Sequence, residues 1–497
     1  MNLLKDPWIP VKINNQFRHI TFNEVLCKEE DRQISVFRDD MELAALQLLI
    51  CLTQVIFPPE NAEALRAREQ EPMDETEFNE GIKPYLEWFD LTHPKYPFMQ
   101  IINTQAKKIT PIQKLFVGLP EGNNHSFFNT PAEITQACGA CVSVALFNQA
   151  SNSPGFGGGF KDSLRGSRVA ITTLISGKTL RKTIWLNVLH QDKIGKIMPM
   201  KAETDPVWIK PVKEKEKVFA HQTGLCRGLF WQPSRVYLEW SNKEMTCHAC
   251  GCNAKDFVIR FKKEGFTYDF NGQWPHPHSP RQWKLDKGEK KESFASFTTT
   301  APAWTQLNSL LIGKEEEKQG VIPAAVVSQY RNVFACQKLE LSVGGYRNNK
   351  ASVLERRHEI FSLPAGWEDN LEKIEEIIGL ALEVKEILHN KKLYRFGEAV
   401  GGKKSKFPQS FSKTSEELFY QHSESLIHEI LREMDWKEIM SIRRDLAKKL
   451  VALAKRIFDD LTRPFCHDPK FLKSVVMARH ELFEDLNKKL PERRKHE

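Results

Sequence analysis

The chain lacks a hydrophobic run long enough to cross a membrane. Its most apolar stretch, residues 43–57, is about fifteen residues long, whereas a spanning helix needs about 20 apolar residues. The opening residues, MNLLKDPWIP, place Asp6 and Pro7 where a secretory signal needs an uninterrupted apolar segment. We therefore expect a cytoplasmic protein without a membrane partner, and a buried core helix at residues 43–57.

The sequence also lacks the motifs of several enzyme classes. His-Glu pairs begin at 358, 428 and 480 but never extend to H-E-x-x-H, and G-x-S-x-G does not occur. The glycine-rich stretch SPGFGGGFKDS does not end in Gly-Lys-Ser/Thr, so it is no phosphate-binding P-loop. It fails G-x-G-x-x-G as well, because Phe160 stands where the last glycine is needed. With no catalytic constellation in the sequence, we expect a protein that is not an enzyme.

Composition sets broader bounds on domain number and partners. A chain of 497 residues has room for two or three domains. Its 41% hydrophobic and 27% charged residues are ordinary for a globular protein, and its net charge of +8 is a modest basic bias that suits a polyanionic partner. Internal repeats are not visible. These features bound the class of protein without identifying it.

Residue patterns predict an α+β fold in which strand-like alternation gives way to helical periodicity near Pro364. The first 36 residues alternate as short strands, and residues 168–177 and 182–189 also have strand character. In 256–274 the alternation predicts a hairpin whose turn at 262–265 carries two lysines. Beyond Pro364, apolar residues recur at helical spacing.

We therefore expect a mixed α/β N-terminal domain over residues 1–365 and a four-helix bundle over 366–497. A Lys/Gly/Pro linker precedes a bundle helix that is expected to start at Thr414 or Ser415.

Two close cysteine pairs predict a metal site. Of the ten cysteines, Cys138 and Cys141 form one C-x-x-C pair, and Cys247 and Cys250 form the other. Together they offer four thiolates for one tetrahedral zinc ion, with no open position, so a structural role is expected. His248 and Cys252 are alternative ligands, and a chance grouping of unrelated thiols is the alternative to any metal. A zinc ion bound here would link two segments that lie about a hundred residues apart in the sequence.

Three loops stand out as candidate contact surfaces. Residues 118–137 form a long loop with Phe127 and Phe128 at its middle, which either plug the core or contact a ligand. The glycine loop, residues 155–159, has a bare backbone that either turns freely or meets something bulky at close range. Residues 343–352 set glycines beside amide and cationic side chains, which suits a nucleic-acid groove or simply a polar hairpin turn.

Several of these stretches resemble one known family. The stretches are RDDMELAALQLLICLTQ, YPFMQ, ALFNQASNSPGFGGGFK, RGLFWQP, NGQWPHPHSP, TTTAPAWTQ and GGYRNNKASVLERRHE. They resemble the large subunit, CasA, of the type I-E CRISPR Cascade complex, from residue 1 to about 365 and more faintly beyond. The resemblance implies a zinc-containing α/β domain followed by a four-helix bundle.

It also implies a role in antiviral defence. Such a subunit binds other Cascade subunits and the guide RNA, and recognises the protospacer-adjacent motif (PAM) of duplex DNA through the minor groove. It then helps open the duplex into an R-loop, holds the displaced strand and recruits a helicase–nuclease.

Carried across position by position, the resemblance assigns residue roles. The four paired cysteines fall on zinc ligands, and Phe127 and Asn129 fall in a loop that docks to the guide's 5′ end. The DNA-contacting positions are Gly155, Gly157, Gly158, Gly159, Lys262, Lys263, Asn349, Lys350 and Ala351.

This sequence departs from the family pattern at two of the DNA-contacting positions. The residue that wedges the DNA duplex apart is commonly glutamine in the family but is Lys350 here. The family's minor-groove lysine aligns with Gly265, and the nearby cations in this chain are Lys262 and Lys263. The preferred PAM is therefore left open. The alternatives are a zinc-dependent nucleic-acid enzyme and an architectural zinc scaffold whose loops contact only proteins.

Overall fold

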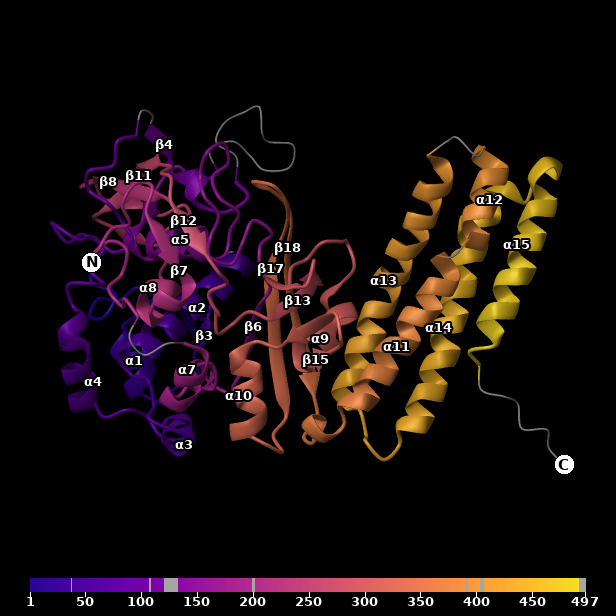
Figure 1. Cartoon of the computed structure of the whole chain (residues 1–497), viewed down its shortest axis with the longest axis horizontal. Helices are drawn as coiled ribbons and strands as arrows, with labels where there is room; N and C mark the ends of the chain where they lie inside the picture. The colour runs from indigo at the N-terminus through magenta and orange to yellow at the C-terminus, as the bar shows by residue number, and fades with distance from the viewer. Residues whose placement is uncertain are drawn as a thin grey trace. The chain divides into compact units, whose positions relative to one another are not determined.

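The computed structural model describes residues 1–36, 38–106, 109–119, 133–198, 202–389, 391–402 and 406–490 (Figure 1). The chain forms two compact units. The first unit comprises 1–298, 313–334 and 341–360; the second comprises 299–312, 335–340 and 361–497. A domain boundary at residue 365 stays a prediction.

Helix α2 (Asp39–Ile56) is the buried centre of the first unit. Thirteen of its side chains are buried, and it packs against α5 (Gly139–Ser151), α6 (Leu180–Leu186) and α8 (Leu225–Leu229). Three acidic residues in its first turn complement the positive end of the helix dipole. The predicted core helix is confirmed. Among the described residues, no helix is both long and apolar enough to cross a membrane.

The N-terminal strands form a small antiparallel sheet of β1 (Ile9–Ile13), β2 (Gln16–Ile20) and β3 (Gln33–Ile34). Asn14 and Asn15 make the turn between β1 and β2 with φ of 49° and 63°, a conformation that asparagine tolerates. The strand prediction is wrong at residues 22–27. Thr21 and Glu24 form a capping box that starts α1 (Phe22–Cys27), which is a local helix signal stronger than the strand alternation.

A second sheet is centred on β11 (Phe257–Glu264). Its partners are β8 (Arg235–Ser241), β4 (Ile109–Pro111) and β5 (Ala137–Cys138), all antiparallel. The next strand, β12 (Asp269–Asn271), pairs instead with β7 (Lys217–Phe219). The predicted hairpin at 262–265 is therefore wrong: Lys262 and Lys263 lie within β11, because this strand's partners come from distant segments.

The strand predicted at 182–189 is also wrong, because these residues begin in α6. Its N-cap, Thr179, accepts a hydrogen bond from the backbone of Lys182, and six of its seven side chains are buried. A short apolar run of this kind does not distinguish a buried helix from a strand.

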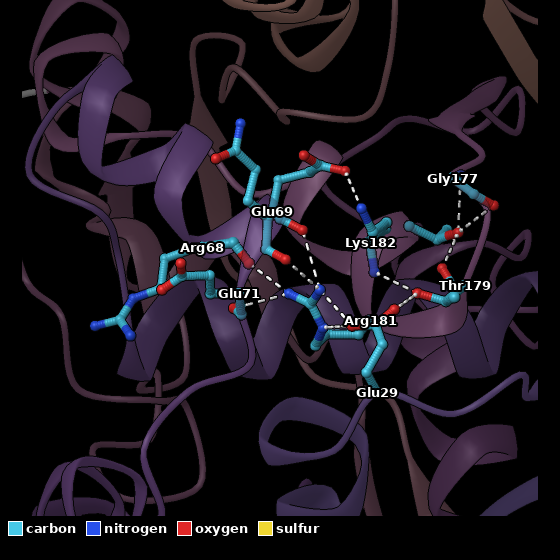
Figure 2. A network of polar contacts seen from close by, with 10 residues as sticks. Glu29, Arg68, Glu69, Glu71, Gly177, Thr179, Arg181 and Lys182 are labelled. Carbon is cyan, nitrogen blue, oxygen red and sulfur yellow. Dashed lines mark hydrogen bonds and ion pairs between the residues drawn. The ribbon is translucent and has the colours of Figure 1, made fainter.

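Arg181 of α6 joins this helix to α3 (Ala62–Gln70) (Figure 2). Its guanidinium donates to the carbonyls of Arg68 and Glu71 at 2.7 and 2.9 Å, and to those of Glu69 and Gln70 at 3.1 and 3.2 Å. These carbonyls end α3 and lack helical partners, so the arginine satisfies them. Glu29 pairs with the same guanidinium and balances its charge.

Among the described residues, two further sheets contain four and three strands. One contains β13 (Arg281–Asp286), β14 (Glu289–Phe294), β16 (Gln319–Ile322) and β15 (Lys314–Glu315). The other pairs β6 (Thr172–Ile175) with the long hairpin of β17 (Leu339–Asn349) and β18 (Ser352–Leu363). Residues 341–360 of this hairpin belong to the first unit, and the residues of β17 and β18 on either side belong to the second.

The C-terminal part of the second unit is helical, as predicted. Its helices are α11 (Leu371–His389), α12 (Lys391–Gly401), α13 (Phe407–Glu433), α14 (Ile439–Thr462) and α15 (Pro469–Asn487). α11 packs against α13 and α14, and α12 packs against α13 and α15. The start predicted for α13 at Thr414 or Ser415 is wrong. The helix begins at Phe407, because Pro408 occupies the first turn, where proline fits.

Candidate functional site

The two cysteine pairs meet in the first unit as a cluster of four thiols. Cys138 ends β5, and Cys141 lies in the first turn of α5. Cys247 and Cys250 lie in the turn between β9 (Met245–Thr246) and β10 (Asn253–Ala254). The four Sγ atoms all lie within 4.8 Å of one another. The grouping predicted from the C-x-x-C spacing is therefore present.

Backbone contacts hold the two halves of the cluster together. The amide of His248 donates to the Gln136 carbonyl at 3.1 Å, and the amide of Cys138 donates to Cys247 Sγ at 3.3 Å. The backbone of Gly251 has a φ of +74°, and its amide donates to the Cys247 carbonyl at 2.8 Å. Glycine therefore allows the tight turn that holds Cys247 and Cys250. The cluster rests on the sheet, because β5 pairs with β11.

The donor set fits a tetrahedral zinc ion. Cys138 Sγ and Cys250 Sγ are 3.8 Å apart, which matches the roughly 3.8 Å edge of a tetrahedron with Zn–S bonds of about 2.3 Å. Hydrogen bonds from the neighbouring thiols, first that of Cys138, lower the pKa of Cys247 and favour its thiolate. All four donors are sulfur atoms, the pattern of closed structural sites.

The two alternative ligands lie outside this tetrahedron. His248 uses Nδ1 within 3.1 Å of the Thr135 hydroxyl. Cys252 belongs instead to a neighbouring group with His19 and Cys250. Burial, and then the charge of Cys250, raise the pKa of the Cys252 thiol to about 12.

The glycine loop folds back on itself beside β11. The amide of Gly155 donates to Asp162 Oδ1 at 3.2 Å, and a Cβ at Gly155 would lie only 2.7 Å from the Lys161 carbonyl oxygen. The amide of Phe160 donates to the Gly157 carbonyl at 3.0 Å. Gly157, Gly158 and Gly159 all have positive φ, which side chains disfavour. The glycines are thus required by the backbone path.

The end of β11 supports this loop. A Cβ at Gly265 would lie 2.8 Å from the Gly159 carbonyl oxygen, so only glycine fits without a shift. Lys263 Nζ lies 5.0 Å from the ring centre of Phe156 and 5.6 Å from that of Phe160, in cation–π range. Lys262 points to the opposite face, because side chains alternate along a strand. The structure therefore brings Lys263, and not Lys262, to the glycine loop.

The tip of the β17–β18 hairpin reaches the same place. Lys350 and Ala351 form its two-residue loop, and Lys350 has φ of +53°. The side-chain oxygen of Asn348 accepts from the Val169 amide at 3.2 Å, and its amide group donates to the Lys350 carbonyl at 2.6 Å. A Cβ placed on Gly157 would be 3.4 Å from Ala351 Cβ. The hairpin tip and the glycine loop are in contact.

A buried polar network fixes the hairpin below its tip. The Tyr346 hydroxyl donates to Asp40 Oδ2 at 2.7 Å and accepts from Asn148 Nδ2 at 2.8 Å. Arg38 pairs with the same carboxylate at 2.7 Å. Burial by itself raises the pKa of Asp40, but the bond to Arg38 and its positive charge, followed by the Tyr346 bond, lower it overall. Sequence reasoning missed these residues, because an aspartate and a tyrosine three hundred positions apart share no local pattern.

We call the glycine loop, Lys263 and the tip at 349–351 the convergent surface. Of the predicted nucleic-acid contacts, it contains Gly155, Gly157, Gly158, Gly159, Lys263, Asn349, Lys350 and Ala351. Phe127 and Asn129 lie outside the described residues.

Comparison with known proteins gives a consistent family. The family model of the CRISPR-associated protein Cse1 matches residues 2–457. A curated relative, the CRISPR-associated protein CasA/Cse1 of Thermus thermophilus, is 23% identical over 395 residues, which cover 75% of this chain and 74% of that protein.

Solved structures have the same fold. The crystal structure of Thermobifida fusca Cse1 matches with a TM-score of 0.79 at 15% identity, over 99% of this chain and 98% of that one. A chain of a CRISPR RNA-guided surveillance complex matches with a TM-score of 0.68 at 16% identity, over 97% of this chain and 99% of its own length. The resemblance read from the sequence motifs is therefore confirmed, and the chain belongs to the CRISPR-associated protein Cse1 family.

Proposed function

We propose that this chain is a non-catalytic subunit of a type I-E Cascade complex that recognises the PAM of duplex DNA. Family membership and the likeness to a chain of a surveillance complex support the assembly. The main support for a role in DNA recognition is the contact between Gly157 and Ala351, which joins the glycine loop to the hairpin tip. Two segments far apart in sequence thus present one surface.

The chemistry of the convergent surface suits a minor groove. Bare glycine backbone permits close approach to DNA, and the Lys350 ammonium at a hairpin tip can insert between strands and attract phosphate. The minor groove distinguishes A·T from G·C pairs but little more, so several PAM sequences should be accepted. Exchange of duplex for guide heteroduplex is nearly balanced, so contacts at the PAM decide whether R-loop opening begins.

Further parts of the proposal concern partners and architecture. We infer that Phe127 and Asn129 meet the 5′ end of the guide RNA, and that other Cascade subunits flank this chain in the cytoplasm. Basic residues of the C-terminal helices hold the displaced strand without sequence preference, and this region helps recruit the helicase–nuclease. We further propose that α11 to α15 make a four-helix bundle in which α11 and α12 share one position. The mutual packing of α11, α13 and α14 supports this.

The cysteine cluster completes the proposal as a site for one structural zinc ion. Its four thiolates hold β5 and α5 against the 247–250 turn, and β11 leads from that turn to the convergent surface. Metal chemistry is not part of the proposed activity, because four thiolates leave a tetrahedral ion no open position.

The test is a binding series with the assembled complex. Lys350→Ala should weaken binding to targets with a duplex PAM about tenfold, an effect of about 1.4 kcal/mol, and leave PAM-free single-stranded targets unchanged. The matched control is Lys287→Ala. Lys287 also stands in a two-residue hairpin loop, with φ of +52°, but between β13 and β14. Equal loss on both kinds of target would contradict the wedge.

Two outcomes would favour other functions. Normal PAM discrimination after shortening of the glycine loop would point to an architectural scaffold whose loops contact only proteins. Metal-dependent DNA cleavage by the purified chain would point to a zinc-dependent nucleic-acid enzyme.

A further inference from the structure

A second group of soft ligands lies beside the four-thiol cluster. It consists of His19, Cys250 and Cys252, whose ligand atoms lie within 4.8 Å of one another. His19 comes from β2, whereas the two cysteines flank Gly251 in the 247–252 turn. One imidazole and two thiols are donors that zinc and similar cations prefer.

The two groups share Cys250. Its sulfur is 3.8 Å from Cys138 Sγ in the first group and within reach of His19 and Cys252 in the second. The amide of Cys247 donates to the Cys252 carbonyl at 2.8 Å, so the turn that builds the first group also fixes the backbone of the second. A thiolate has more than one lone pair and can bridge two cations.

One ring nitrogen of His19 has no hydrogen-bond partner among the described residues. This atom, Nε2, is buried. A buried polar atom left without a partner is costly, and the majority of such atoms in folded proteins are satisfied. Coordination of a cation would satisfy the imidazole nitrogen.

A cavity of about 200 Å³ adjoins the group. His19 and Cys252 line it, together with Thr92, Trp240 and Asp256. The cavity gives a cation a route to His19 and Cys252 and gives a water molecule room to complete the tetrahedron. Three protein ligands with one open position differ from the closed arrangement of the four thiols.

We propose that His19, Cys250 and Cys252 form a second, exchangeable site for a thiophilic divalent cation such as Zn²⁺, bridged through Cys250 to the four-thiolate site. This goes beyond the proposed DNA-reading function and rests on its zinc site. The second site fills at higher free zinc than the first and empties first, because it has fewer protein ligands and shares one of them.

The first experiment counts ions per chain by native mass spectrometry across a buffered Zn²⁺ series. The wild type should pass from one ion to two, whereas His19→Ala and Cys252→Ser should stop at one. The ion that remains in each variant reports that the fold and the first site are intact. His248→Ala is the matched control and should still reach two, because His248 bonds to Thr135 and belongs to neither group.

The second experiment adds Co²⁺ to protein that already holds one zinc ion. Paramagnetically shifted imidazole resonances should appear and should be lost in His19→Ala, since a four-thiolate site contains no imidazole. One ion per wild-type chain at saturating zinc, or two in His19→Ala, overturns the second site and leaves the first standing. No bound ion at all overturns both sites.

Discussion

Asp40 is a buried charge whose partners come from three parts of the first unit. Arg38 precedes it at the start of α2, Tyr346 reaches it from β17, and Arg356 approaches it at 3.3 Å from β18. A buried carboxylate is tolerated only when it is paired and hydrogen-bonded. Removal of the charge leaves the Arg38 guanidinium, with only 7% of its side chain exposed, without its counterion.

Asp40→Asn should therefore destabilise the first unit by about 3–5 kcal/mol, the usual cost of breaking a buried pair. Because the folded pKa of Asp40 is lowered, its ionised form stabilises the fold above the unfolded pKa of about 3.9. That contribution is lost as the pH falls through the folded pKa. Urea unfolding at pH 7 and at low pH measures both effects.

Asp39→Asn is the matched control for this prediction. Asp39 pairs with the same Arg356 at 3.3 Å, but its side chain is 43% exposed. Loss of such a surface pair should cost less than about 1 kcal/mol. Similar losses in both variants would contradict the role given to the buried network.

Two buried histidines predict a stability that falls in mild acid. Burial, followed by the nearby Arg165 charge, lowers the pKa of His278 to about 3 and that of His276 well below its ordinary value. The unfolded chain takes up protons on these imidazoles below about pH 6.5, whereas the folded chain does not. Stability should therefore drop by about 2 kcal/mol per histidine between pH 7 and pH 5.

Equilibrium unfolding at several pH values tests this prediction. His278→Asn keeps a polar group near Gln47, whose Nε2 lies 3.2 Å from His278 Nδ1. In this variant the free energy of unfolding should depend less steeply on pH, by the uptake of about one proton. An unchanged slope would show that His278 is protonated inside the folded protein.

At the level of elements, local signals were predictable and distant pairings were not. The α2 helix and the short strands β1 and β2 depend on patterns among neighbouring residues, and both followed from the sequence. The 262–265 hairpin was predicted because β11 and β12 are neighbours in sequence. Their real partners, β8 and β7, are set by tertiary packing that no local alternation reveals. The grouping of the two cysteine pairs was predicted correctly, because each C-x-x-C pair has the spacing of metal ligands even though the pairs are far apart in sequence.

Gly265 gives an element-level prediction about the convergent surface. In Gly265→Ala the new Cβ would lie 2.8 Å from the Gly159 carbonyl oxygen, which must shift. Displacement of the glycine loop from the end of β11 should weaken binding of a duplex PAM about tenfold in the assembled complex, or about 1.4 kcal/mol. A binding series on the same DNA panel used for Lys350 measures the loss.

Gly379→Ala is the control for the same substitution elsewhere. Gly379 lies inside α11, and a Cβ there meets open space. Alanine should stabilise this helix by about 0.5–1 kcal/mol and leave DNA binding unchanged. Unaltered PAM affinity in Gly265→Ala, with the melting temperature preserved, would show that the glycine loop does not depend on β11.

At the scale of the whole molecule, an ion held by the cysteine cluster would act as a cross-link. It would join residues 138–141 to residues 247–250 and close a loop of about a hundred residues. By the chain-entropy argument used for disulfides, closing a loop of that length in the unfolded chain is worth about 4.7 kcal/mol. A bound ion would contribute at least this constraint to the first unit.

Metal removal should therefore loosen the first unit. A strong chelator should lower its melting temperature and speed hydrogen exchange in β5, α5 and β11, whereas the helices α13 and α14 of the second unit keep their protection. Cys336→Ser is the control, because Cys336 is exposed and lies in the second unit. Unchanged exchange in β5 after complete metal loss would contradict the cross-link.

How the chain is threaded has a consequence for engineering and evolution. The border between the two units falls after residues 298, 312, 334, 340 and 360, so the polypeptide passes between them five times. Cutting the chain at one point cannot separate the two units. A fragment that ends at residue 360 still contains residues 299–312 and 335–340, which belong to the second unit but would lack the rest of it. Recombination between relatives at one crossover would likewise mix segments of both units. The two units should therefore be inherited together, and a functional chimera needs several junctions.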